Sequence, residues 1–171
     1  MNLRLSVLLL LLSALALPAA PAWAQILPPA TLTTTLSQPT GKVGTGLDLV
    51  VTAKIQTGWY LYSTDFSDEV GPAVFSLVVT KSPAYALVGK PRSIGSKRVH
   101  DDVFNGEVAY FEKTGQVRQR IRLLKAGPLT VRAEAGYQSC SGADGRCVPG
   151  STSLTFGPLR TTAKASAAVA P

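Results

Sequence analysis

The amino-acid sequence predicts an all-β protein built as an immunoglobulin-like antiparallel β-sandwich. Apolar and polar residues alternate with a period of two in several separate segments, which is the pattern of half-buried strands. Gly and Pro turn signals divide these segments, and the chain after residue 24 carries no amphipathic helix pattern. About seven or more short strands at such close spacing are typical of two sheets packed face to face.

Three segments carry the alternation most clearly, and they are residues 47–55, 117–123 and 129–137. Weaker strand candidates are residues 32–36, 73–80, 108–112 and 154–156. In the second clear segment Arg118, Arg120 and Arg122 share the polar side. A solvated sheet face is the simpler interpretation of these arginines. The alternative is a surface for an acidic partner, since the chain carries a formal net charge of +7.

The composition excludes several other classes of protein. The chain has 171 residues, of which 46% are hydrophobic and 16% charged, and it contains two cysteines. It is too apolar for a disordered chain, and it has too few cysteines for a disulfide-stapled miniprotein. One domain is expected over residues 31–160, with an extended lead-in at 25–30 and a disordered tail of small residues at 161–171.

The first 24 residues are predicted to be a signal peptide. Arg4 supplies a positive charge, residues 5–17 form an apolar run, and Ala22-Trp23-Ala24 matches a cleavage site. The apolar run is shorter than the roughly 18 residues that a membrane span needs. We therefore expect an exported protein that is soluble after cleavage.

Cys140 and Cys147 follow a predicted strand and flank a Gly-rich loop. In an exported protein this pair can form a disulfide, and a structural staple is one interpretation. The eight-residue ring would contribute only about 2.5 kcal/mol in the entropic model, against about 4.7 kcal/mol for a 100-residue ring. A disulfide across a short exposed loop is also open to a partner's thiolate, as exchange chemistry requires. Two cysteines and one histidine cannot complete a zinc site, so no metal or cofactor is expected.

An aromatic cluster, Trp59-Tyr60-Leu61-Tyr62, follows the breaker Gly58. Alternation places Trp59 and Leu61 on one face and the two tyrosines on the other. One face should pack in the core. The other would be displayed, where it could line a binding surface or shield a reactive site.

A polar loop at residues 100–106 contains one bulky aromatic residue, Phe104. His100 beside Asp101 and Asp102 is most simply a solvated turn. A Ser-His-Asp hydrolase is not supported, because the chain has no Gly-x-Ser-x-Gly motif.

In this order, the three features resemble the periplasmic N-terminal domain of the thiol:disulfide interchange protein DsbD. The matching motifs are Gly-Trp-Tyr-Leu-Tyr at 58–62, the acidic loop with a Phe before Gly at 100–106, and Tyr-Gln-Ser-Cys to Cys-Val-Pro at 137–149. The resemblance covers most of the chain after residue 24. It implies an immunoglobulin-like fold with a capped two-cysteine redox loop.

The resemblance also implies roles for single residues. Phe104 would cap the disulfide, Cys147 would form the mixed disulfide with partners, and Cys140 would resolve it. Tyr60 and Tyr62 would lie beside the pair, and the carboxylate of Asp102 would disfavour the thiolate and so restrain reactivity.

The implied function is a periplasmic relay of electrons through the Cys140/Cys147 pair, which is the activity of a thiol:disulfide oxidoreductase. Its implied partners are a membrane electron carrier of the DsbD or CcdA type and periplasmic thioredoxin-like proteins, such as a disulfide isomerase or a cytochrome c maturation factor. Nucleic acid is not expected as a partner of an exported protein.

Two positions depart from the family pattern. Six residues separate the cysteines where the family has five, and Arg146 replaces an aromatic residue, where its charge should favour a thiolate on Cys147. Two alternatives therefore stay open. One is a non-enzymatic immunoglobulin-like binding module with a structural Cys140–Cys147 disulfide, and the other is a relict domain without exchange partners.

Overall fold

The computed structural model describes residues 28–102 and 104–163, and the regular secondary structure in this part of the chain is almost all strand. The predicted signal peptide lies outside the described residues. The strands are β1 (Ala30–Leu36), β2 (Thr40–Lys42), β3 (Gly46–Ile55), β4 (Trp59–Tyr62), β5 (Ser76–Val79), β6 (Tyr85–Ile94), β7 (Lys97–Asp101), β8 (Gly106–Glu112), β9 (Thr114–Leu123), β10 (Gly127–Ser141) and β11 (Cys147–Thr162). A 3-10 turn, η2 (Asp68–Val70), lies between β4 and β5.

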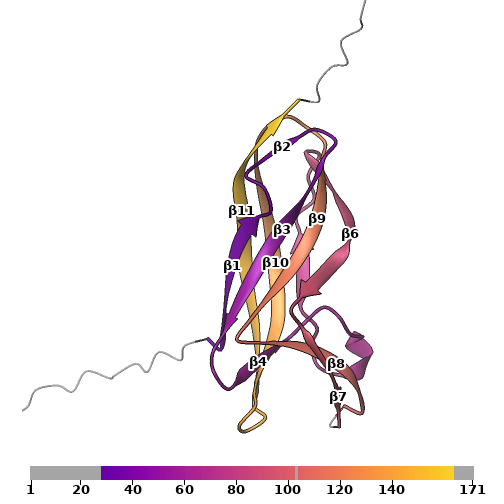
Figure 1. The fold of residues 1–171 in the computed structure, drawn as a ribbon, viewed down its shortest axis with the longest axis vertical. Helices are drawn as coiled ribbons and strands as arrows, with labels where there is room; N and C mark the ends of the chain where they lie inside the picture. Colours follow the sequence, from indigo (N-terminus) through magenta and orange to yellow (C-terminus); the bar gives the residue numbers. More distant parts are fainter. Residues whose placement is uncertain (1–27, 103, 164–171) are drawn as a thin grey trace, which may run out of the picture.

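The strands form two sheets, as an immunoglobulin-like sandwich requires (Figure 1). One sheet has the order β1-β3-β9-β6, and the other has the order β2-β11-β10-β4-β8-β7 with β5 also paired to β10. All recorded strand pairs are antiparallel except β2 with β11. The predicted fold class is confirmed.

The core between the sheets follows from the alternation. In β3 and β9 the inward positions are fully buried, and they meet inward residues of the second sheet. The largest of these buried side chains include Leu49, Ile121, Leu61, Phe111 and Phe156. A second, smaller cluster lies on the other side of β4, around Tyr62, Val108 and Cys140.

The arginines of β9 lie on the outer face of their sheet, over a buried carboxylate. Asp48 of β3 is only 5% exposed and pairs with Arg120 at 3.3 Å and with Arg92 at 3.2 Å. Both arginines are themselves about half exposed. The stripe of arginines on β9, Arg118, Arg120 and Arg122, is therefore solvated, as predicted. Arg120 is in addition held by its ion pair with Asp48.

The two longest strands extend further than the sequence pattern predicts. β10 continues through Cys140, and β11 begins at Cys147 and runs to Thr162. Thr161 is buried beside its parallel partner Gly41 of β2, so the first two residues of the predicted tail at 161–171 belong to β11. Residues 164–171 of that tail lie outside the described residues. At the other end, Ala30 of the predicted lead-in is already part of β1.

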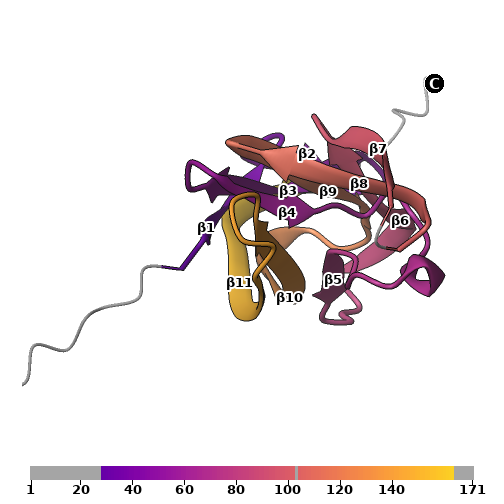
Figure 2. The same ribbon diagram turned by 90° about the horizontal axis from the view of Figure 1, so that it is seen from below.

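Two hairpins project from the same end of the sandwich, which is the lower end in Figure 1 and faces the reader in Figure 2. One joins β10 to β11, and the other joins β7 to β8. The first carries the cysteines and the second carries the polar loop with Phe104. The fold thus brings the predicted site segments, which are distant in sequence, to one end of the molecule.

Candidate functional site

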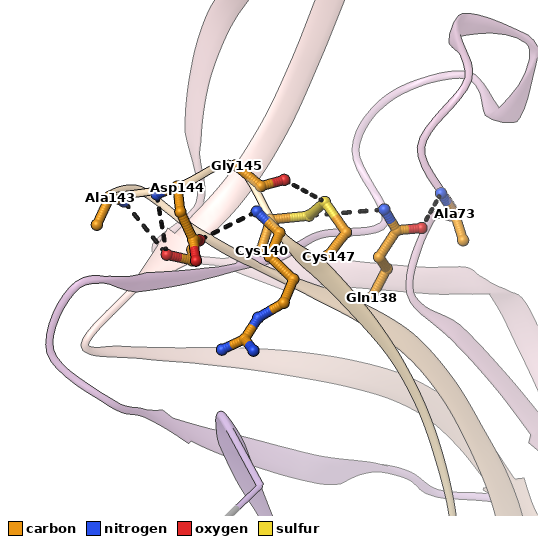
Figure 3. Close-up of a disulfide and its surroundings, with 9 residues drawn as sticks. Ala73, Gln138, Cys140, Ala143, Asp144, Gly145 and Cys147 are labelled. Carbon is orange, nitrogen blue, oxygen red and sulfur yellow. Dashed lines mark hydrogen bonds between the residues drawn. A yellow bond between two sulfur atoms is a disulfide. The ribbon is translucent and has the colours of Figure 1, made fainter.

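The cysteines face each other across the β10–β11 hairpin. Cys140 and Cys147 are register partners with a Cα–Cα distance of 4.0 Å, and they form a disulfide (Figure 3). They therefore lie in strands, and the loop between them is shorter than predicted. Cys140 is fully buried, whereas Cys147 is exposed. A partner thiol can reach the disulfide only from the Cys147 side.

The turn between the cysteines is held by its own polar groups. The N–H of Ser141 donates to the carbonyl of Arg146 at 2.9 Å, and the Ser141 hydroxyl accepts from the N–H groups of Ala143 and Asp144. A hydrogen bond from Ser141 and another from the Arg146 N–H hold the pKa of Asp144 below its ordinary value. The guanidinium of Arg146 lies over the ring of Trp59 at 5.5 Å. This contact competes with the predicted effect of Arg146, whose charge was expected to favour a thiolate on Cys147.

β4 places the aromatic cluster against the buried cysteine. Trp59 and Leu61 face the main core, while Tyr60 lies directly opposite Cys140 and Tyr62 packs in the same small cluster. The ring of Tyr60 is 5.5 Å from that of Tyr62 and 4.9 Å from that of Tyr110.

The face with the tyrosines is therefore not a displayed surface. Tyr62 is only 1% exposed, and Tyr60 is half-buried. Burial, together with a hydrogen bond that the Tyr62 hydroxyl donates to Tyr60, raises the pKa of Tyr62 far above its ordinary value. The phenol is neutral at physiological pH and forms part of the wall around Cys140.

Gln138 is a site residue that we did not single out in the sequence. Its amide nitrogen donates to Cys140 Sγ at 3.6 Å, and its amide oxygen accepts from the N–H of Ala73 at 3.2 Å (Figure 3). The signal for finding it was its position two residues before Cys140, on the same face of the strand.

The β7–β8 hairpin rests on the η2 segment. The ring of Phe104 lies against Gly71, where an added Cβ would be 2.4 Å from Cδ1 of the ring. Val70 packs in the same way on Gly106. Asp101 closes the turn, because its carboxylate accepts from the N–H of Phe104 at 3.2 Å. Phe104 itself is 36% exposed.

The two aspartates of this hairpin lie in different surroundings. Asp102 has a fully exposed carboxylate, 3.9 Å from the imidazole of His100. Asp101 shares its side of β7 with Val99, which packs on the Tyr62 cluster, and its charge helps to raise the pKa of Tyr62. Asp101, rather than Asp102, is thus the acidic group directed toward the buried tyrosine.

A small cleft lies beside the cysteine turn. Its volume is about 230 Å³, and it is lined by residues 56–60, Glu112, Lys113 and Gly142. Among the described residues, no three histidine, cysteine or carboxylate side chains gather as a metal site requires. No helix in residues 28–102 and 104–163 is long and apolar enough to cross a membrane.

The site can be compared with known proteins. The family described as "Thiol:disulfide interchange protein DsbD, N-terminal" matches residues 24–157. The chain belongs to this family. It is a thiol:disulfide interchange domain, and Cys140 and Cys147 are its cysteine pair. The family resemblance predicted from the three motifs is therefore confirmed. No curated protein sequence matches the chain.

Solved structures with the same fold include the DsbD N-terminal domain of Neisseria meningitidis. Its complex with the PilB N-terminal domain gives a TM-score of 0.51 at 17% identity, covering 78% of this chain and 94% of that one. The reduced form gives 0.47 at 18% identity, with 76% and 88% covered. The N-terminal periplasmic domain of ScsB from Proteus mirabilis gives 0.47 at 12% identity, with 74% and 44% covered.

Proposed function

We propose that this domain relays electrons in the periplasm by exchanging its Cys140–Cys147 disulfide with partner proteins. The observation that carries the proposal is the unequal exposure of the two sulfur atoms. Cys147 is exposed on the end of the sandwich, and Cys140 is buried in β10 beside β4. Cys147 then forms the mixed disulfide with the partner, and Cys140 resolves it.

The β7–β8 hairpin acts in this proposal as a cap that restricts access to the disulfide. Phe104 supplies the apolar ring of the cap. The close contact of this ring with Gly71 supports the view that the hairpin is held in one position. Asp101 is the stronger candidate for the restraining carboxylate that the resemblance assigned to Asp102, because it faces the Tyr62 cluster. Tyr60 and Tyr62 exclude water from Cys140.

The proposed partners are a thioredoxin-like protein on one side and a membrane electron carrier on the other. Support for the first comes from a member of the same fold, the Neisseria DsbD N-terminal domain, which forms a complex with the PilB N-terminal domain. The small cleft lined by Trp59, Tyr60 and Gly142 lies beside the cysteine turn and would receive a side chain of a docked partner.

Trapping with single-cysteine variants tests this proposal. In Cys140→Ala the exposed Cys147 cannot be resolved, so mixed disulfides with partners should accumulate in a periplasmic extract. In Cys147→Ala the remaining thiol is buried, and trapping should be lost. Equal trapping by both variants, or by neither, would reject the assigned roles.

The reduction potential of the pair separates a relay from a structural disulfide. Purified protein is equilibrated in thiol redox buffers, and free thiols are counted by mass spectrometry. A value of about −180 to −270 mV is the range of exchange proteins, whereas a value below about −300 mV marks a structural bond. The second outcome would support the alternative of a binding module.

A further inference from the structure

We propose that Gln138 is a catalytic hydrogen-bond donor that stabilises the negative charge on Cys140 Sγ during exchange. The inference rests on the proposed relay function and adds a residue to it. Its amide nitrogen lies 3.6 Å from this sulfur, which is one of the two atoms whose bond breaks.

The orientation of the Gln138 amide is determined by its second hydrogen bond. The N–H of Ala73 can only donate, so the atom that faces it must be the amide oxygen. The NH2 group must then point toward Cys140, as Figure 3 shows. A sulfur acceptor therefore faces a donor that is already oriented before any reaction begins.

Cys140 needs such a donor because it is fully buried. A thiolate there has lost its contact with water, and burial without a compensating hydrogen bond strongly disfavours a charge. Its neighbours in the small cluster, Tyr62 and Val108, are largely apolar. Gln138 offers a neutral donor that stabilises the thiolate without adding a fixed charge.

The chemistry can be followed with oxidised glutathione as the partner. The Cys147 thiolate attacks the glutathione disulfide, forms a protein–glutathione bond and releases one glutathione thiolate. The Cys140 thiolate then attacks Cys147 Sγ, forms the internal disulfide and releases the second. The protein loses two electrons, glutathione gains them, and the thiol protons pass to the released thiolates through solvent. Gln138 acts only in the second step.

Removing the donor has a pH-dependent effect that differs from that of structural damage. Without the donor, a smaller fraction of Cys140 is ionised at low pH, and a tenfold lower thiolate fraction slows the second step. The thiolate that does form is more basic and is therefore a better nucleophile, with a Brønsted coefficient of about 0.4–0.5. In Gln138→Ala the second step should be about 3- to 4-fold slower at low pH and about 3-fold faster at high pH. The two pH–rate profiles should therefore cross.

The experiment mixes reduced protein with oxidised glutathione between pH 6 and 10 and quenches with acid. Mass spectrometry then gives the formation and decay of the Cys147 adduct. Gln138→Ala should change only the decay, and Gln116→Ala, on the outer face of the other sheet, should change neither rate. Gln138→Glu keeps an acceptor for Ala73 but places a carboxylate by the sulfur, so decay should be slower than in Gln138→Ala at neutral pH.

Two results would overturn the inference. One is a decay profile of Gln138→Ala that superimposes on that of the unaltered protein, and the other is a profile that lies parallel to it without crossing. If the unaltered protein forms no adduct, or forms one that never decays, the relay itself is rejected. Failure of the proposed function is thus distinguishable from failure of the role of Gln138.

Discussion

Tyr60 and Cys140 occupy directly opposite positions on the adjacent strands β4 and β10. The buried half of the disulfide is therefore built into a sheet, between a strand that carries tyrosines and the β11 strand that carries Cys147. Sites on strands hold their geometry better than sites on loops. This relationship explains why one sulfur is shielded and the other exposed, although both belong to one short hairpin.

Tyr62 should make the protein less stable at alkaline pH. Burial raises its pKa above the ordinary value of about 10, so above that pH the unfolded state binds fewer protons than the folded state. The contribution of Tyr62 to the free energy of unfolding is fully present below about pH 10. It should fall as the pH rises further, by up to about 1.4 kcal/mol per pH unit for one proton. In Tyr62→Phe this slope should become shallower, as measured by urea unfolding between pH 9 and 12.

Phe66 provides the control for this measurement, because its ring is 5.6 Å from that of Tyr62 but does not titrate. Phe66→Leu should lower stability without changing the slope. An unchanged slope in Tyr62→Phe would mean that another group causes the alkaline loss.

Gly71→Ala should expose the disulfide by displacing Phe104. Gly71 has a φ of 134°, and its added Cβ would be 2.4 Å from the Phe104 ring. The strained backbone should cost of order 1–3 kcal/mol, and the ring must move. Because Phe104 is the proposed cap, reduction of the disulfide by dithiothreitol should become several-fold faster, as followed by thiol labelling.

Gly44→Ala is the matched control for the cap. Gly44 also has a positive φ, of 90°, but an added Cβ would meet nothing within 4 Å. It should lose stability without a change in the rate of reduction. Equal reduction rates in the two variants would argue against a capping role for Phe104.

How far the sequence predicts the fold depends on where each strand lies. β3 and β9 are inner strands of their sheet with one buried face, so their alternation is clear. β6 and β7 are edge strands, and their patterns are weak because much of each strand is exposed. In β6, Pro91 also lies in an irregularity between Val88 and Arg92, where a missing N–H is tolerated.

The site was predictable in its residue types but not in its depth. Two cysteines and the order of the motifs indicated the redox pair. Which sulfur is buried depends on the pairing of β4 with β10, and local sequence does not encode that pairing. The same pairing turns Tyr62 inward, and it makes Asp101 rather than Asp102 the carboxylate directed toward the cluster.

Arg120 should contribute more to stability than Arg122, its neighbour in the stripe. Arg120 pairs with the buried carboxylate of Asp48, and no ion pair is recorded for Arg122 among the described residues. Arg120→Ala should cost about 1 kcal/mol more than Arg122→Ala in urea unfolding, and added salt should reduce the difference. Removing Arg92 as well should cost more than the sum of the single changes, because Asp48 is then left buried without a partner.

Gln119 should be essential for the irregular part of β6. It points inward between the apolar residues of β9 and is only 2% exposed. Its amide nitrogen lies 3.3 Å from the carbonyl oxygens of Val88 and Gly89, where β6 leaves its regular pairing with β9. Because leucine removes the donor that faces these carbonyl oxygens, Gln119→Leu should lower the free energy of unfolding by about 0.5–1.5 kcal/mol even though leucine is more apolar.

Gln116→Leu, on the outer face of the same strand, separates this effect from a general loss of glutamine, and it should change stability by less than about 0.5 kcal/mol. Hydrogen exchange should also become faster at residues 88–92 in Gln119→Leu alone. A leucine variant as stable as the unaltered protein would mean that water replaces the amide at these carbonyls. The polar side chain would then be tolerated in the core rather than required by the strand it supports.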